Sequence, residues 1–222
     1  FRHAGTYGEK NNWGYKLSGE YLTASDWPYT DPNEPAVFPS SAPTPTARQG
    51  KPIKRDFAVR RYSGEVRLDY RDQDKDLENI LTAGLSHIGS AIEITTAFGA
   101  IQARNWTYSS YQDRFRYKKF FAQAFFNSNN AGNSGPNDLT GTYYIRTGIP
   151  VVDKSTVGVL QLQQGFNLMK AKLVVGADYI MTKPQSEGTI FGRNEGSTDI
   201  TEYGAYLQAT MPLTPKLDLV SA

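Results

Sequence analysis

The feature that most constrains this chain is the regular alternation of short and long connections between its strand-like segments. Polar turns of a few residues are expected at 9–12, 72–76, 117–119, 167–170 and 212–216. Long polar loops are expected between them, at 23–55, 87–105, 127–154 and 182–199. In an antiparallel sheet this order places every long loop at the same end. It is typical of an outer-membrane β-barrel, which has tight periplasmic turns and extended external loops.

The segments between these connections have the period-two side-chain pattern of β-strands. After the first turn, Trp13, Leu17 and Tyr21 alternate with Lys16 and Glu20, so the aromatic and charged side chains lie on opposite faces. Similar alternation recurs over 62–71, 106–116, 171–181 and 200–211. The pattern predicts an all-β fold with about ten antiparallel strands of roughly 7–12 residues, long enough to cross a bilayer at a tilt. Asp113 is an exception, because it falls on the apolar side.

Prolines crowd the segment 24–55 and exclude a central strand or a helix there. Two interpretations remain, an external loop and an extended linker between domains. Strand patterns with the same alternation on both sides favour the loop.

Composition excludes several classes of function. With 24 basic and 22 acidic residues, the net charge is +2 and no nucleic-acid-binding surface is predicted. Cysteine is absent, so disulfides and thiolate metal sites are excluded. Aromatic residues make up 13%, and Tyr and Trp favour membrane interfaces. Mean hydropathy is -0.52, which is compatible with barrel strands because only every second side chain faces lipid.

No catalytic, metal-binding or cofactor-binding motif is found. His3 and His87 are isolated from each other in the sequence, and neither is expected to bind a metal. The nucleophile elbow and the phosphate-binding glycine loops are absent. The acidic segment 69–76 lacks the glycine and the closing glutamate of a calcium loop. The chain is therefore not expected to be an enzyme.

Polar and charged side chains on the second face of the strands would project into a common interior. They are Lys16, Glu20, Glu65, Arg67, Asp69, Arg71, Gln112, Arg114 and Arg116. Mixed charges suit a water-filled or plugged barrel. The alternative is the solvent-exposed face of a soluble sheet.

Several passages resemble TonB-dependent outer-membrane receptors. The most telling is MTKPQSEGTIFGRNE at 181–195, followed by TEYGAYLQ at 201–208. VVDKS at 151–155 with LQLQQGF at 160–166 resembles the preceding strand, and RHAG at 2–5 with GYKLSGEYL at 14–22 resembles early barrel strands. The resemblance covers most of the chain except the proline-rich loop.

The resemblance implies that 1–222 is about the first half of a receptor barrel, with about ten of an expected 22 strands. The plug domain, the segment that contacts TonB and the C-terminal strands would lie outside this chain. The implied function is energised uptake of a scarce nutrient, such as a siderophore, a cobalamin-like compound, a glycan or a peptide. The implied location is the bacterial outer membrane, and the implied partners are its lipid, the rest of the barrel with its plug, TonB and the nutrient.

Five residues are candidates for binding that nutrient: Trp27, Tyr29, Arg104, Trp106 and Arg193. Ordinary loop packing or anchoring at the membrane interface are alternative roles for each. Two alternative functions also remain. One is a complete ten-stranded outer-membrane protease similar to the omptins, closed between its first and last strands, with His87 at its rim. The other is a soluble carbohydrate-binding β-sandwich.

Overall fold

The computed structural model describes residues 1–40, 47–95, 99–132, 139–190, 192–214 and 216–221. Its elements are β1 (Arg2–Tyr7), β2 (Trp13–Ser25), β3 (Ala58–Asp72), β4 (Leu77–Thr95), β5 (Gly99–Tyr117), β6 (Phe120–Asn130), β7 (Tyr143–Tyr144), β8 (Thr156–Leu168), β9 (Ala171–Lys183), the 3-10 helix η1 (Gly192–Ser197), β10 (Ile200–Thr214) and β11 (Leu217–Ser221). No helix in these described ranges is long and apolar enough to span a membrane.

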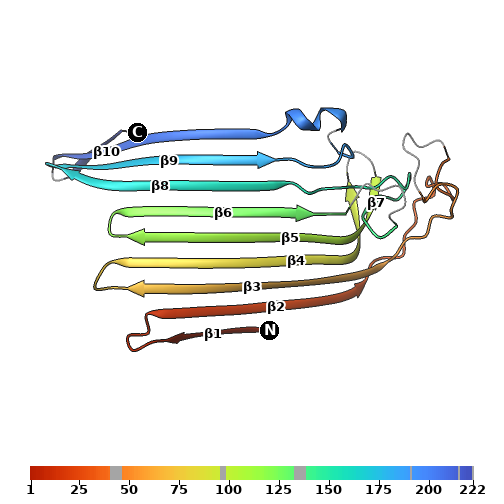
Figure 1. Ribbon diagram of the computed structural model, residues 1–222, viewed down its shortest axis with the longest axis horizontal. Coiled ribbons are helices and arrows are strands. Elements are labelled where there is room, and N and C mark those ends of the chain that lie inside the picture. The colour runs from red at the N-terminus through yellow and green to blue at the C-terminus, as the bar shows by residue number, and fades with distance from the viewer. Residues whose placement is uncertain (41–46, 96–98, 133–138, 191, 215, 222) are drawn as a thin grey trace.

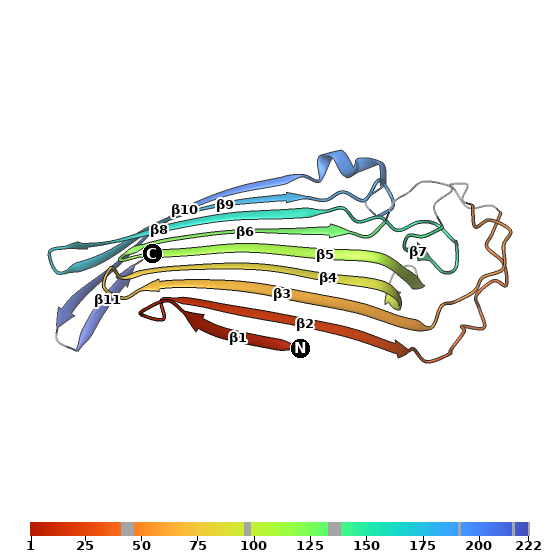
Figure 2. The same ribbon diagram turned by 60° about the horizontal axis from the view of Figure 1, so that its bottom comes forward.

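The strands form one antiparallel sheet in which neighbours in the chain are neighbours in space (Figure 1). The order runs from β1 to β11, except that the short β7 pairs with β5 instead of joining the main path. The sheet is curved and open (Figure 2), and within the described ranges β1 pairs with β2 alone and β11 with β10 alone. The prediction of an all-β, antiparallel fold is confirmed. The closure that a ten-stranded protease would need is not observed between these two edges.

All five predicted short turns are confirmed as hairpin connections at one end of the sheet (Figure 1). Four of them contain a non-glycine residue in the left-handed backbone region, namely Asn11, Asp76, Lys118 and Met169, each with φ near 50°. That conformation lets the chain reverse within very few residues.

The predicted loop at 87–105 is wrong over most of its length. The pairing of β4 with β5 continues from His87↔Thr107 to Thr95↔Gly99. This extension of the hairpin is packed against other segments, and residues 100–103 of β5 are all buried. A strand that is covered on both faces loses the alternation of apolar and polar residues, so the sequence pattern failed here.

The remaining long connections are confirmed. The proline-rich segment joins β2 to β3, whose pairing begins directly beside it at Ser25↔Ala58. It is therefore a loop between neighbouring strands of one sheet, and the interdomain linker is excluded. The connection after β6 holds β7, and the connection after β9 holds η1. Residues 41–46, 133–138 and 191 of these loops lie outside the described residues.

The hydrophobic core lies under the long loops, at the end of the sheet opposite the turns. Its buried apolar members are Phe38, Ala100, Ile101, Ala103, Ala131, Tyr143, Ile145, Val151 and Val152. We call this set the loop core. Among the described residues of the sheet outside it, Ile80 is the only buried apolar residue. The body of the sheet therefore exposes its large apolar side chains instead of burying them, and Tyr203 is 79% exposed.

Strand register separates these apolar side chains from the charged ones. One continuous row runs across the sheet through Tyr15, Leu68, Leu81, Asp113, Ala124, Leu160, Tyr179 and Tyr203. The alternate rows form the opposite face, which is mostly polar and charged over β2 to β5 and also carries Phe125, Val159 and Ile180 on β6, β8 and β9. We call the two sides the apolar face and the polar face. All nine polar and charged residues expected in a common interior lie on the polar face.

Candidate functional site

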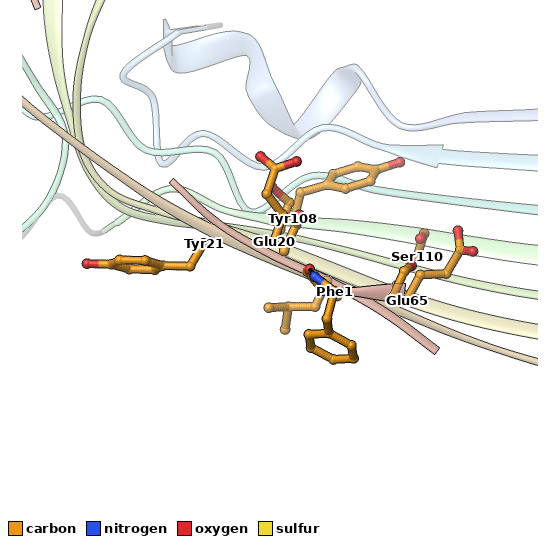
Figure 3. Close-up of a pocket in the computed structure, with 13 residues that line it drawn as sticks. Phe1, Glu20, Tyr21, Glu65, Tyr108 and Ser110 are labelled. Atoms are coloured by element: carbon orange, nitrogen blue, oxygen red, sulfur yellow. Dashed lines mark hydrogen bonds between the residues drawn. The ribbon is translucent and has the colours of Figure 1, made fainter. Parts of the chain in front are cut away.

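The candidate site is a hydroxyl-rich area on the polar face, in the half nearer the long loops. Two paired rows build it: Glu20, Ser63, Ser86 and Tyr108 in one, and Ser18, Glu65, Gly84 and Ser110 in the other. They line a cavity of about 700 Å³. Figure 3 shows the labelled Glu20, Glu65, Tyr108 and Ser110 on one side of the sheet, with Phe1 and Tyr21 on the other.

The hydroxyl groups of this area are available to a ligand. We call the set Ser18, Ser63, Ser86, Tyr108 and Ser110 the hydroxyl cluster. Within the described part of the chain, none of these side chains makes a hydrogen bond to another protein group. Each hydroxyl can both donate and accept a hydrogen bond, so the cluster suits a ligand with many polar groups.

The two carboxylates beside the hydroxyl cluster are already paired. Glu20 lies 2.8 Å from the Arg61 guanidinium, and Glu65 lies 2.5 Å from Lys16 Nζ. These side chains are substantially exposed, so the pairs add little stability. Their main consequence is local neutrality beside the cavity.

The half of the polar face nearer the turns differs, because its polar groups bind one another. Arg67 contacts Asp69 at 2.6 Å. Glu78 is surrounded by three arginines, with Arg71 at 3.5 Å, Arg114 at 3.7 Å and Arg116 at 3.8 Å. A hydrogen bond of 3.1 Å from Gln123 to Gln161 continues this pairing across β6 and β8. This half is a self-paired wall.

Asp113, the acidic residue on the apolar face, has a specific partner. Asn79 donates a hydrogen bond to its carboxylate at 2.6 Å from the neighbouring strand. The two residues are diagonal neighbours, since Asn79 pairs with Phe115 and Asp113 with Leu81. The amide reduces the cost of placing a carboxylate among apolar side chains.

A buried polar network anchors the proline-rich loop to the extended β4–β5 hairpin. The side chain of Gln102 is fully buried. Its amide nitrogen donates to the Asp56 carbonyl at 3.1 Å, and its oxygen accepts the Asp56 N–H at 2.9 Å. The Ser90 hydroxyl donates to the Asp56 carboxylate at 2.9 Å. The network fixes the end of the loop just before β3 begins.

The environment of Asp56 favours its ionised form. Desolvation acts against ionisation, but it is outweighed by the Ala58 N–H, the Ser90 hydroxyl and the charges of Arg60 and Arg104, so the pKa of Asp56 lies below its usual value. Asp56 is thus an anionic anchor for the surrounding donors.

A second carboxylate organises the connection between β9 and β10. Glu195 accepts hydrogen bonds from the N–H groups of Ser186, Glu187 and Gly188 and from the Ser186 hydroxyl at 3.0 Å. Desolvation opposes the charged form, but these donors outweigh it and lower the pKa of Glu195. This arrangement occupies the carboxylate and makes it a structural group.

The residues predicted to bind a nutrient lie in different places. Trp27 and Tyr29 follow β2 and are 81% and 57% exposed. Arg104 lies in β5, 3.9 Å from the Asp56 carboxylate. Trp106 donates from Nε1 to Asn129 at 3.3 Å.

Trp106 is the predicted residue that belongs with the hydroxyl cluster. It precedes Tyr108 by two positions on β5, where the register is regular, and therefore lies on the same face. No hydrogen bond, ion pair or ring contact joins Trp27 or Tyr29 to it within the described residues. Arg193 lies in η1, and its side chain is outside the described part of the structure.

Sequence reasoning missed the serines and Tyr108. Alternation puts each of them on the polar face of its own strand, but only the register of β2, β3, β4 and β5 brings them together.

The two histidines lie apart and have local partners. His3 contacts the Tyr15 hydroxyl at 3.2 Å. His87 contacts the Thr107 hydroxyl at 2.8 Å and stacks on Tyr62, with ring centroids 4.7 Å apart. His87 is thus on the apolar face, where no described carboxylate contacts its ring.

Comparisons with protein-family models, curated proteins and solved structures give no match to this chain.

Proposed function

We propose that this sheet is an arc of an outer-membrane receptor barrel that takes up a scarce nutrient. The observation that carries the proposal is the large apolar face, which is exposed across the whole meander, while charged side chains concentrate on the opposite face of β2 to β5. An apolar surface of this extent needs a cover. Lipid on one side and a polar interior on the other are what a transmembrane barrel provides.

Aromatic side chains support a bilayer-sized band on this face. Trp13 and Tyr21 lie on the apolar face of β2, and their register partners Tyr70 and Tyr62 lie on the same face of β3. Each pair encloses roughly nine residues, close to the 9–11 that cross a membrane at a tilt. At the turn end, Trp13 packs against Tyr70 with centroids 4.7 Å apart. Such rows suit the two interfaces of a bilayer.

The shift of the aromatic row across the sheet supports tilted strands. Tyr203, near the loop end of β10, is in register with Tyr15 of β2 through seven strand-to-strand steps. The corresponding aromatic of β2 is Tyr21, so the row moves by 21 minus 15, or six, residues. With about 3.3 Å per residue and 4.8 Å between strands, the tilt is about 30°. Membrane barrels have tilts of about 35–45°.

Receptor function rests on the resemblance of the sequence to TonB-dependent receptors and on the available hydroxyl cluster. The proposal includes further strands that pair with β1 and β11, because backbone groups in lipid need partners. It also includes a plug domain that covers the self-paired wall and receives energy from TonB.

Electrophoresis of the native, detergent-extracted protein with and without boiling tests this proposal. We expect an unboiled band with shifted mobility, and an intact mass far above the 24.7 kDa of this chain. A shifted band at 24.7 kDa would favour a small closed barrel instead. A species that needs no detergent and shows no shift would refute the membrane assignment.

A further inference from the structure

The two halves of the polar face point to the chemistry of the ligand, on the premise of the proposed receptor function. In the half near the turns, Arg67 and Glu78 are engaged by neighbouring protein charges. In the half near the loops, the hydroxyl cluster has no protein partner within the described residues. Polar groups that are unpaired beside a cavity of about 700 Å³ are the ones that a ligand can engage.

The charges around the cavity disfavour an anionic ligand. Its lining contains Glu20 and Glu65 but no lysine or arginine side chain among the described residues. Arg61 and Lys16 on the same face are held by these two carboxylates, and Arg67 is held by Asp69. A negatively charged chelate would find no free positive partner in these neutral surroundings, whereas a neutral molecule needs none.

Two aromatic residues of β5 lie with the hydroxyl cluster: Tyr108 lines the cavity, and Trp106 lies two positions before it. Tyr108 is exposed and Trp106 is half-buried, and both belong to the polar face. A sugar ring has one relatively apolar face of C–H groups and a rim of hydroxyls. It can therefore pack on aromatic rings while its rim exchanges hydrogen bonds with neighbouring side chains.

Gly84 keeps the floor of the site open. It lies between Glu65 and Ser110 in the paired row. A Cβ atom at this position would come within 2.9 Å of the Ser110 hydroxyl oxygen. The absence of a side chain thus leaves room for Ser110 Oγ and for a ligand above it.

We propose that the hydroxyl cluster, with Trp106 and Tyr108, binds a neutral polyhydroxylated ligand of the oligosaccharide class. Its hydroxyls would replace water on the serine and tyrosine side chains, and its ring faces would pack on the aromatics. Among the nutrients implied by the sequence, this selects a glycan over an anionic iron chelate.

Calorimetric titration of the native, detergent-solubilised protein tests the proposal. The probes are neutral gluco-, manno-, xylo- and galacto-oligosaccharides, with a ferric catecholate chelate as the anionic comparison. We expect one neutral series to bind. Tyr108→Ala should weaken its binding about tenfold or more, as expected for the loss of an aromatic contact. Gly84→Leu should also weaken it, because the new side chain fills the floor of the site.

Tyr206→Ala is the matched control. Tyr206 is on the polar face of β10, in register with Gly176 and far from the hydroxyl cluster. The Tyr206→Ala substitution should leave oligosaccharide binding unchanged. The inference is overturned if no neutral oligosaccharide binds, if the chelate alone binds, or if Tyr206→Ala weakens oligosaccharide binding as much as Tyr108→Ala does. The heat-shifted band is measured in the same preparation. If the band is present but binding fails, the ligand assignment is wrong. If the band is absent, the membrane assignment itself is wrong.

Discussion

Replacing Leu160 with arginine is expected to destabilise the membrane-inserted protein by about 2–4 kcal/mol, the cost of a cation on the lipid face near the bilayer midplane. Leu160 is 42% exposed on the apolar face, between Ala124 and Tyr179. In water, a substitution at a site this exposed would change stability by only about 0.5 kcal/mol. The size of the effect therefore reports what covers the face.

Gln161→Arg is the matched control for this prediction. Gln161 is the next residue of β8 and lies on the polar face, where it accepts a hydrogen bond from Gln123. An arginine there meets the polar interior of the barrel instead of lipid and should be tolerated much better than at position 160. Urea titration of each variant in lipid vesicles, followed by the fraction of heat-shifted band, measures the difference. Equal stabilities for the two variants would mean that the apolar face does not meet lipid.

Replacing Tyr143 with alanine should release the proline-rich loop from the sheet. Tyr143 is buried, its ring lies 3.9 Å from the Arg48 guanidinium, and it meets the edge of Phe38 with centroids 5.9 Å apart. Removal of a large buried aromatic costs about 3–5 kcal/mol. The loss falls on the loop core, because these contacts join β7 to the loop and do not reach the centre of the sheet.

Hydrogen exchange distinguishes this local release from global unfolding. The amides of Phe38 and Ile53, which are hydrogen-bonded within the loop, should exchange much faster in Tyr143→Ala. The β2–β3 amides should be unchanged. Tyr29→Ala serves as the control, since Tyr29 is exposed in the same loop. Unaltered protection of Phe38, or equal acceleration in β2 and β3, would contradict the assignment of Tyr143 to a separate loop core.

Local sequence signals were sufficient for the hairpins and the two faces. The turn residues interrupt segments such as 62–71, whose alternation follows directly from strand geometry. Local sequence signals were insufficient where a strand packs against segments that are distant in the chain. The β4–β5 extension is covered by the loop core, including Tyr143 of β7, so its burial depends on segments far away in the chain.

The candidate site was only partly predictable for a related reason. Trp106 is expected at the start of the strand segment 106–116, beside the loop predicted at 87–105, and it lies well inside β5, which begins at Gly99. Ser18 and Ser110 are far apart in sequence and come together only through the register of three strand pairs. A single strand pattern does not specify that register.

Cysteine labelling on intact cells tests the orientation of the sheet, and with it the membrane assignment, most directly. This chain has no cysteine, so Trp27→Cys in a long loop and Met169→Cys in a short turn would each introduce a single thiol into it. Both positions are highly exposed, at 81% and 95%. We predict that a membrane-impermeant maleimide labels Trp27→Cys on intact cells and labels Met169→Cys only after the outer membrane is opened. Equal labelling of both on intact cells would contradict a membrane between the long loops and the short turns.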